Sequence, residues 1–383
     1  MQAVILAAGE GTRLRPLTGS RPKAMIPIAN RPIIGYVIDS LVQNGIRDII
    51  IVIGYKKEQV SRYLNQLDIP VTVVVQEKQL GTAHALKAAE KEIREDFLLL
   101  PGDNYIDPKS IASIKDERNA MLVKEHPNPS NFGVVVISGG RVIDIVEKPE
   151  LAPTHTVSTG IFSLQKDFIQ HLNRTEIPDV MGCMLKEGIQ MKAVYAEDWQ
   201  DAIYPWDILK LNAQLLKGTV PRKGGTLHSS VTLQGPVRIG TGTTIGPKTA
   251  IFGPAVIGND CRIGPNCCIM PQSSIGSRVE IEPFTFLGNS LLMDDTRIGS
   301  HSRISDMVVG SGCVLLDHIT SCQSETIFEI DGGMHKAKFG AILGDRVRAD
   351  PFTVFRNCIV GNNVAIREGR TITGQVPDGV VVI

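Results

Sequence analysis

The first half of the chain alternates short apolar runs with amphipathic stretches. The apolar runs lie at residues 3–7, 49–53, 71–75 and 97–100, and the amphipathic stretches at 32–42, 56–67 and 82–93. Strands that alternate with helices over short turns predict an α/β fold with a doubly wound, mostly parallel sheet. Ligands bind such sheets at the carboxyl ends of the strands. We therefore expect a site in loops 8–23, 76–82 and 101–107.

Beyond residue 230, aliphatic residues recur at every sixth position. They are Leu233, Ile239, Ile245, Ile251, Ile257, Ile263, Ile269, Ile275, Ile281 and Leu287, and the spacing of six or twelve returns between Ile298 and Ile304 and along Ile342, Val354, Val360, Ile366 and Ile372. A period of six belongs neither to a helix nor to an ordinary strand. It is typical of hexapeptide repeats, three of which form one turn of a parallel β-helix.

Two further segments shape the predicted domain organisation. Residues 217–230 have the composition of a linker, so we expect one domain at 1–216 and a β-helix domain at 231–383. Residues about 317–340 are polar and interrupt the period. Insertions in solenoids map to loops on one face, and this one is either a binding loop or a surface loop without a ligand.

Composition limits the partners and the compartment. Forty basic residues balance forty acidic residues, which argues against a nucleic-acid-binding protein. The seven cysteines include no C-x-x-C pair, so neither disulfides nor a zinc site is predicted and the cytoplasm is the expected location. The longest aliphatic stretch, 49–53, is far too short to span a membrane.

The charge of the first 31 residues differs from that of the whole chain. Five basic residues stand against Glu10 alone, and Gly9 and Gly11 follow the first apolar run. A glycine turn after a strand lets backbone N–H groups approach phosphates closely. The segment is neither a Walker A loop nor a complete dinucleotide fingerprint. It predicts a phosphate-binding loop, with a tight turn and solvated arginines as the alternative.

The same segment carries a family resemblance. LAAGEGTRLRPLT, followed by RPKAMIPI, resembles the signature of the sugar-1-phosphate nucleotidyltransferases, the NDP-sugar pyrophosphorylases. The likeness continues in order through QEKQLGTAHAL (76–86), PGDN (101–104), NFGVVV (131–136), VEKP (146–149), STGIF (158–162) and YPWDILKLN (204–212). With its repeats, the chain is similar to archaeal bifunctional N-acetylglucosamine-1-phosphate uridyltransferase/glucosamine-1-phosphate acetyltransferases. The resemblance implies a Rossmann-like first domain and a left-handed β-helix.

The resemblance also implies a reaction. A sugar-1-phosphate oxygen attacks the α-phosphorus of a nucleoside triphosphate and pyrophosphate leaves, so positioning and charge neutralisation carry the rate. Arg13 would neutralise the triphosphate, and Lys23 would bind the same phosphates or the sugar phosphate. The implied nucleotide-binding residues are Leu6, Ala8, Gly9, Gly11, Thr12, Gln76, Gly81 and Thr82.

Two carboxylates occupy the family's metal positions. Asp103 and Asp207 are implied Mg²⁺ ligands, since that ion is often held by one or two carboxylates together with substrate phosphates. Taken alone, Asp103 could be a turn residue and Asp207 the N-cap of a helix over 208–216. Their joint occurrence in the family's order favours the metal.

The implied base and sugar sites determine the expected substrates. The amide of Gln76 can pair with both an acceptor and a donor on a pyrimidine, and the loop resembles the uridylyltransferase version, which favours UTP over dTTP. His84 is expected to pack on its helix without a role. The implied sugar-binding residues are Gly133, Glu147, Lys148 and Thr159. The family commonly has Asn in place of Thr159, so N-acetylglucosamine-1-phosphate and glucose-1-phosphate both remain candidates.

The β-helix departs from the acetyltransferase pattern. His301 stands roughly where the family places its general base, but the residues after it differ. Lys336, Lys338, Arg346 and Arg348 could face coenzyme A or solvent. We expect a stacking module that forms a homo-oligomer, a trimer as in the resembled family, and acetyl-CoA as a cosubstrate only if the site is active. A bifunctional enzyme, a glucose-1-phosphate thymidylyltransferase and a non-catalytic regulatory or scaffold subunit remain alternatives.

Overall fold

The computed structural model describes residues 1–330 and 332–383 and divides into two compact units. The first unit comprises Met1–Glu10, Pro22–Met25 and Ile33–Asp201, and the second comprises Gly11–Arg21, Ile26–Pro32 and Ala202–Ile383. Two early segments and the stretch from residue 202 therefore make their contacts with the β-helix. The division of contacts thus differs from the single boundary expected at 217–230.

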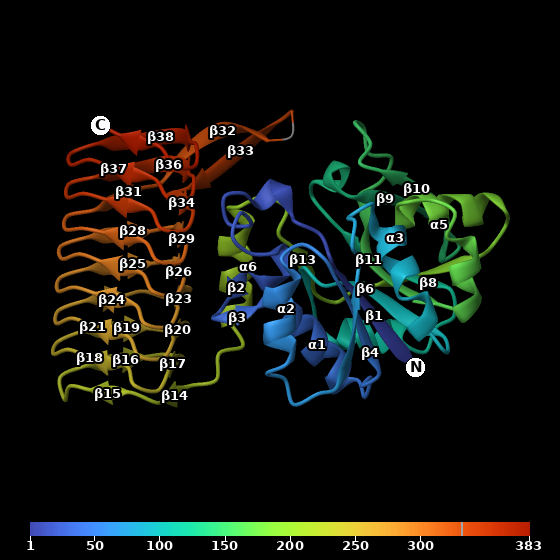
Figure 1. Cartoon of the computed structure of the whole chain (residues 1–383), viewed down its shortest axis with the longest axis horizontal. Coiled ribbons are helices and arrows are strands. Elements are labelled where there is room, and N and C mark those ends of the chain that lie inside the picture. Colours follow the sequence, from blue (N-terminus) through green and yellow to red (C-terminus); the bar gives the residue numbers. More distant parts are fainter. Residues whose placement is uncertain (331) are drawn as a thin grey trace. The chain divides into compact units, whose positions relative to one another are not determined.

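A nine-stranded sheet forms the core of the first unit (Figure 1). Its strands, in spatial order, are β5 (Val71–Val75), β4 (Ile49–Ile53), β1 (Gln2–Ala7), β6 (Phe97–Pro101), β11 (Thr156–Leu164), β8 (Ala120–Glu125), β12 (Met191–Tyr195), β10 (Arg141–Glu147) and β9 (Gly133–Ser138). From β5 to β6 every pairing is parallel, as the alternating pattern predicts. Beyond β6 the sheet is mixed, because β11 runs antiparallel to both β6 and β8.

Shorter elements complete the first unit. Its α-helices are α1 (Ile33–Gln43), α2 (Lys57–Leu64), α3 (Thr82–Ala88), α4 (Pro108–Ile114) and α5 (Ile177–Lys186), and its 3-10 helices are Lys23–Met25, Glu90–Glu92, Pro129–Asn131 and Lys166–His171. A two-stranded sheet pairs β7 (Asn104–Ile106) with β13 (Trp199–Asp201). Within the described residues, no helix is both long enough and apolar enough to cross a membrane.

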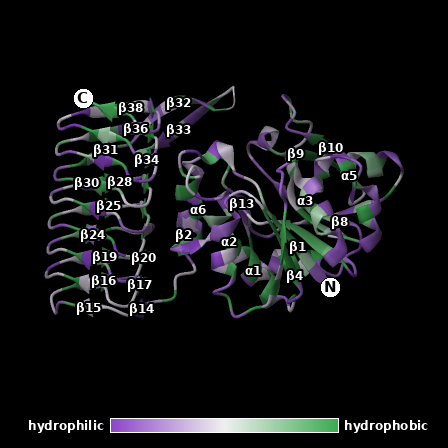
Figure 2. Ribbon diagram, viewed as in Figure 1, coloured by the Kyte–Doolittle hydropathy of each residue, from purple (hydrophilic) through white to green (hydrophobic). Residues whose placement is uncertain are grey.

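The centre of this sheet is buried on both faces. All five residues of β4 are buried, as are almost all of β1, and Figure 2 colours both strands as hydrophobic. A continuous aliphatic run is what a parallel strand covered by helices requires. The polar residues that follow these strands are thereby brought to one edge of the sheet.

The second unit contains a parallel β-helix with three faces. The first face holds β14 (Arg222–Lys223), β17 (Val237–Ile239), β20 (Ala255–Ile257), β23 (Ser273–Ile275), β26 (Leu291–Leu292), β29 (Met307–Val309) and β34 (Ala341–Leu343), and β38 (Thr371–Val376) spans this face and the third. The second holds β15 (Thr226–Leu227), β18 (Thr244–Ile245), β21 (Arg262–Ile263), β24 (Glu280–Ile281), β27 (Arg297–Ile298), β30 (Val314–Leu315), β35 (Arg348–Ala349), β37 (Ala365–Ile366) and β39 (Val381–Val382). The third holds β16 (Thr232–Gln234), β19 (Ala250–Phe252), β22 (Cys268–Ile269), β25 (Phe286–Gly288), β28 (Arg303–Ser305) and β31 (Thr320–Cys322), and β36 (Val354–Val360) pairs with strands of both the first and the third face. The first coil begins inside the predicted linker, at Arg222.

Strand register explains the period of six and where it fails. Ile239 pairs with Ile257, eighteen positions on, whereas Ile281 pairs with Ile298, only seventeen on. The shorter coils contain one step of five residues. For this reason the predicted phase at Ile342 and Val354 is wrong: Leu343 and Phe355 join the core instead. The register of β36 against β38 shifts between Phe355 and Cys358, which is where the phase changes.

Small polar residues at the coil corners bind the next coil. The hydroxyl of Thr243 donates to the carbonyl of Gly258 (2.7 Å), and the thiol of Cys261 donates in the same way to Gly276 (3.0 Å). Burial raises the pKa of Cys261 and raises that of Cys313 to about 12. All seven cysteines are free. The buried thiols of Cys261 and Cys313 therefore serve packing rather than nucleophilic chemistry.

The sequence predicted a polar loop at 317–340, but the structure has a strand hairpin there. Ile319 still belongs to the core, and β32 (Ser324–Ile330) and β33 (Gly333–Phe339) form an antiparallel hairpin, with Asp331 outside the described residues. Phe328 and Phe339 are buried, and both contact Trp206 with ring centroids 5.6 Å apart. The two aromatic side chains thus give the otherwise polar hairpin a small buried cluster against Trp206.

Early segments of the chain are anchored on the β-helix within the second unit. The segment 11–21 contains the 3-10 helix Thr12–Leu14, and residues 26–32 form the pair β2 (Pro27–Ile28) and β3 (Arg31–Pro32). The guanidinium of Arg21 binds the carboxylate of Asp345 at 2.7 Å, and Asp345 is 3% exposed. On helix α6 (Asp207–Leu216), the amide oxygen of Asn212 accepts from the N–H of Ala29 (3.0 Å).

Candidate active site

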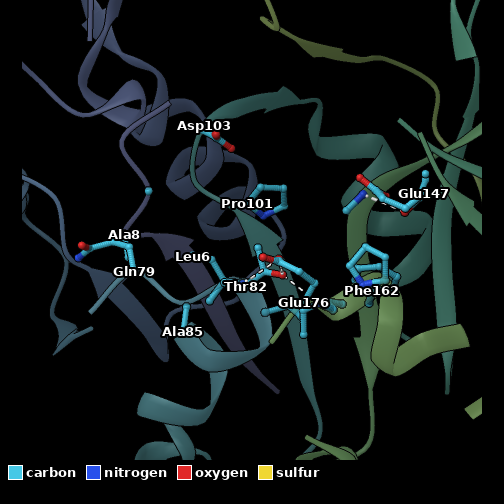
Figure 3. Close-up of a pocket in the computed structure, with 18 of the residues that line it drawn as sticks. Leu6, Ala8, Gln79, Thr82, Ala85, Pro101, Asp103, Glu147, Phe162 and Glu176 are labelled. Carbon is cyan, nitrogen blue, oxygen red and sulfur yellow. Dashed lines mark hydrogen bonds between the residues drawn. The ribbon is translucent and has the colours of Figure 1, made fainter. Parts of the chain in front are cut away.

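The first unit encloses a cavity of about 470 Å³ beside the carboxyl ends of β1, β5 and β6. Nine residues with predicted roles line it: Leu6, Ala8, Gly9, Gln76, Gly81, Thr82, Asp103, Gly133 and Glu147. Figure 3 shows Ala8 and Gln79 at one side of the cavity, Glu147 and Phe162 at the other, and Asp103 above them. Residues predicted to bind the base and residues predicted to bind the sugar therefore line one space.

Two glycines allow the loops around β1 to approach closely. A Cβ at Gly102 would come within 2.9 Å of the Cβ of Ala7, and a Cβ at Gly54 would come within 2.9 Å of the carbonyl oxygen of Ala8. Real Cβ atoms do not tolerate such separations from backbone. Gly102 thus permits the tight turn after β6 that carries Asp103 to the edge of the cavity.

Lys23 forms a charged group with two carboxylates. Its ammonium lies 3.2 Å from Asp103 and 2.7 Å from Asp201, and its side chain is 11% exposed. Burial alone would lower the pKa of Lys23, but the negative charges of Asp103 and Asp201 outweigh that effect and raise the pKa. Lys23 therefore stays protonated in neutral solution. Asp201 was not anticipated from the sequence, because its only signal is a polar residue ending a three-residue strand.

The loop between β5 and α3 is shaped by hydrogen bonds within the protein. Gly81 has φ 120°, and a Cβ there would meet the carbonyl of Thr175 at 2.4 Å. Glu176 accepts from both the N–H and the hydroxyl of Thr82, at 3.0 and 2.7 Å. The Thr82 side chain thus anchors the start of α3 to the segment before α5.

His84 was expected to have no role, yet it contacts a cavity residue. Its Nδ1 lies 2.9 Å from the amide nitrogen of Gln76, whose Nε2 also donates to the carbonyl of Gly81 at 3.1 Å. The sequence placed His84 near the start of a helix but gave no sign of what its side chain contacts. The contact depends on how β5 and α3 pack.

The predicted sugar side is only partly as expected. Gly133 pairs with Glu147 across β9 and β10, and a Cβ at Gly133 would approach the Glu147 carboxylate to 3.0 Å. Lys148 binds Glu147 at 3.0 Å with both side chains about half exposed. Thr159 does not face the cavity: it is 2% exposed, and its hydroxyl donates to the carbonyl of Leu122 (2.8 Å). Its neighbour Ser158 lines the cavity instead.

Four predicted residues belong to the second unit. Gly11, Thr12 and Arg13 lie in the segment 11–21, where Gly11 has φ 75° and its carbonyl accepts from the hydroxyl of Thr18 (2.9 Å). Asp207 is the first residue of α6 and not its N-cap, which is Trp206. Its Oδ2 accepts from the N–H groups of Ile203 and Tyr204 at 3.2 and 2.9 Å.

The donor set at the cavity suits a magnesium ion completed by substrate. Asp103 is 37% exposed at its side chain and offers carboxylate oxygens, the ligand type that Mg²⁺ prefers. Within the described residues, no group of three or more His, Cys, Asp or Glu side chains is placed to hold a metal. A single carboxylate at the rim fits an ion that takes its other ligands from phosphates and water.

His301 lies at an exposed corner of the β-helix. Its ring stacks between Phe284 (centroids 4.9 Å) and His318 (5.2 Å), and its backbone has φ 55°. Of the four basic residues considered for coenzyme A, three have polar partners: Lys336 pairs with Glu325, Arg348 with Asp350, and Arg346 with the amide of Asn363.

Comparison with known proteins places this fold and cavity in a family. The sequence profile described as nucleotidyl transferase matches residues 2–218, more than half of the chain. The chain belongs to this family. The profile of the GMPPB C-terminal domain matches residues 251–376, within the β-helix.

Relatives of this nucleotidyl transferase family member extend over most of its length. The bifunctional protein GlmU of Methanococcus maripaludis strain C5 is 34% identical over 367 residues, which cover 91% of this chain and 89% of that protein. The bifunctional sugar-1-phosphate nucleotidylyltransferase/acetyltransferase of Sulfurisphaera tokodaii is 29% identical, with 99% of both chains covered. The UTP–glucose-1-phosphate uridylyltransferase AglF of Haloferax volcanii is 35% identical over 226 residues, 54% of this chain and 93% of its own.

One solved structure supports the fold of the nucleotidyltransferase part. The inositol-1-phosphate CTP transferase of T. maritima superposes with a TM-score of 0.51 at 24% identity, covering 57% of this chain and 96% of that chain.

Proposed function

We propose that the protein is a sugar-1-phosphate nucleotidyltransferase that converts UTP and a sugar-1-phosphate into a UDP-sugar and pyrophosphate. The observation that carries the proposal is the cavity that Gln76 and Gly81 line together with Gly133, Glu147 and Asp103. A nucleotide base at one side and a sugar at the other leave the phosphates near Asp103 and Lys23. The family match and the three named relatives agree with this chemistry.

The reaction requires charge control more than covalent catalysis. The sugar phosphate oxygen attacks the α-phosphorus of UTP, and the bond to pyrophosphate breaks as that group leaves with the electron pair. Lys23 is held in its charged form and supplies a fixed positive charge where anionic oxygens gather. Asp103 and Asp201 keep it oriented before the phosphates arrive.

The remaining predicted roles enter as part of the proposal. Asp103 would hold Mg²⁺, which when bound neutralises phosphate charge and aligns the triphosphate. Arg13 and Asp207 keep the roles that the family motif gives them, triphosphate binding and metal binding. Glu147 would accept hydrogen bonds from sugar hydroxyls, and Ser158 replaces Thr159 as the polar side chain of that wall.

The substrate choice rests on two features. The loop QLGTAHA is of the uridylyltransferase type, and the AglF relative uses UTP by its name, so we favour UTP over dTTP. We favour N-acetylglucosamine-1-phosphate or glucose-1-phosphate as the sugar. The glucose-1-phosphate thymidylyltransferase remains the competing substrate assignment.

A substrate panel tests the proposal directly. The full chain is incubated with Mg²⁺, each common nucleoside triphosphate and each of several sugar-1-phosphates, and pyrophosphate and the nucleotide sugar are measured. We expect turnover with UTP, and D103N, which keeps the size of the side chain, should lose most of it. No pyrophosphate from any combination would leave only the regulatory or scaffold alternative.

A second activity is favoured by one relative. The S. tokodaii protein, which covers 99% of this chain, is named an acetyltransferase as well. Acetylation of glucosamine-1-phosphate by acetyl-CoA would release a free thiol, and H301A should abolish that release if His301 is the base. Absence of the thiol would support our preferred alternative, a β-helix that serves homo-oligomer formation.

A further inference from the structure

The amide of Gln76 has no free donor. Gln76 is 3% exposed and lines the cavity, and its Nε2 makes two contacts: 3.1 Å to the carbonyl of Gly81 and 2.9 Å to Nδ1 of His84. A carbonyl can only accept a hydrogen bond, so Gly81 fixes which end of the amide is nitrogen. The second N–H then points to His84, whose Nδ1 must accept it. Both amide hydrogens are used inside the protein.

The consequence concerns what the cavity can offer a base. Among the described residues no group donates to Oε1, and Oε1 is not one of the buried polar atoms that lack a partner, so this oxygen is accessible as an acceptor. An acceptor placed opposite N3 of the base pairs with the N–H that uracil and thymine carry there, whereas N3 of cytosine is itself an acceptor. The expectation that Gln76 offers both a donor and an acceptor to the base is therefore wrong for this arrangement.

We propose that His84 is the positioning residue that makes the site selective for uracil-type bases, because it holds the amide of Gln76 with its oxygen available. The proposal rests on the proposed function in so far as Gln76 faces the base. His84 is itself fixed, since Thr82 is bound by Glu176 and the N–H of Ala83 donates to the carbonyl of Thr175 (2.8 Å). Its Nδ1 is presented from a rigid first turn of α3.

Removing the acceptor should relax the choice of base. Without Nδ1, only the carbonyl of Gly81 still holds the amide nitrogen and one N–H of Gln76 has no partner in a buried position, so the turned amide becomes less unfavourable than in the wild type. The turned amide presents N–H groups to the cavity, which cytosine N3 can accept. Discrimination between UTP and CTP is therefore the readout, because a purely structural role of His84 would weaken both nucleotides together.

The test compares three variants of the full chain. H84N keeps an acceptor, because the Asn Oδ1 lies at about the position of the His Nδ1, whereas H84L has none. K87A changes an exposed residue of the same helix and is the matched control. Binding of UTP and CTP is measured by calorimetry in the absence of sugar phosphate, and KM and kcat for both nucleotides are measured with it.

The expected pattern is specific. Wild type, H84N and K87A should bind UTP over CTP with the same ratio of affinities. In H84L this ratio should fall about tenfold or more, and the change should appear in KM and in the binding constant rather than in kcat. A preference in H84L equal to wild type, or an H84N variant as relaxed as H84L, would overturn the proposal. If H84L does not fold, as judged by circular dichroism, H84F provides a ring without an acceptor. Should no nucleotide be turned over at all, the proposed function fails, while the binding ratio still decides the role of His84.

Discussion

The cavity of the first unit and the interior of the β-helix use polar residues in opposite ways. Around the cavity, Asp103 follows the buried strand β6 and Glu147 ends β10, and both side chains stay partly exposed. Inside the β-helix, buried hydroxyls and thiols such as those of Thr243 and Cys261 donate to a backbone carbonyl of the next coil.

The difference teaches where chemistry can arise in each fold. A doubly wound sheet ends its strands at a common edge, so polar residues in separate loops converge there without weakening the core. A stacked repeat uses its inner polar groups to join neighbouring coils, which leaves corners and insertions for function. His301 and the β32–β33 hairpin occupy those two kinds of position.

The largest expected effect concerns the charge at the cavity. K23A should lower nucleotidyl transfer about 100- to 1000-fold, because it removes a preorganised positive charge and leaves two carboxylates without their cation. K248A, at an exposed corner of the β-helix, is the matched control and should leave turnover unchanged. Pyrophosphate release measures both. Equal rates in the two variants would remove Lys23 from the mechanism.

The second largest expected effect concerns the β32–β33 hairpin and the free energy of unfolding. F339A should destabilise the second unit by about 3–5 kcal/mol, because a fully buried ring stacked on Trp206 is lost. I327A, on the same hairpin but 59% exposed, should cost little. Urea unfolding followed by Trp fluorescence compares them. A hairpin that is merely extruded would give two small and similar changes.

The corner hydrogen bonds predict a smaller effect. T243V keeps the side-chain volume but leaves the carbonyl of Gly258 and the N–H of Cys261 without the hydroxyl that joins them. The loss should be about 1–3 kcal/mol in urea unfolding. T244V, on the exposed side of the same strand region, is the control. No difference between the two would mean that these bonds do not stabilise the stack.

The buried thiols predict a pH dependence. Burial raises the pKa of Cys313 and of Cys358 to about 12, above that of a thiol in the unfolded chain. Their preference for the folded state is complete below the unfolded pKa of about 8.5 and is lost as pH rises towards 12. Thermal unfolding at pH 8 and pH 10 should show a modest loss of stability at the higher pH. The double variant C313A/C358A should show less of it.

Much of the architecture was predictable because it is periodic. The spacing of six identified the β-helix from residues such as Ile239 and Ile257, and the alternation of strands and helices identified the parallel part of the first sheet. The phase failed at Ile342 and Val354 because a coil of seventeen residues keeps the same register as one of eighteen. A single step of five residues cannot be recognised from the spacing alone, because the sequence does not show which strands pair.

The lining of the cavity was predictable where glycines and motif residues share one loop, and less so where distant segments meet; the roles of these residues stay predictions. Thr159 was misplaced because alternate residues of a strand face opposite sides, so a shift of one position exchanges Ser158 for Thr159. The contacts of Asp201 with Lys23 and of His84 with Gln76 depend on tertiary packing. No local sequence pattern predicts either contact.

The ion pair between Arg21 and Asp345 bears on how this protein can be divided. The two residues lie 324 positions apart, yet they anchor the segment 11–21, which contains Arg13, to a coil near the end of the chain. A fragment ending at residue 216 would leave the guanidinium of Arg21 without that partner. It would keep the hydrogen bond from the N–H of Ala29 to Asn212 on α6. The nucleotidyltransferase part and the β-helix therefore cannot be exchanged independently. Removing or replacing the β-helix also alters the segment 11–21, which is expected to bind the triphosphate.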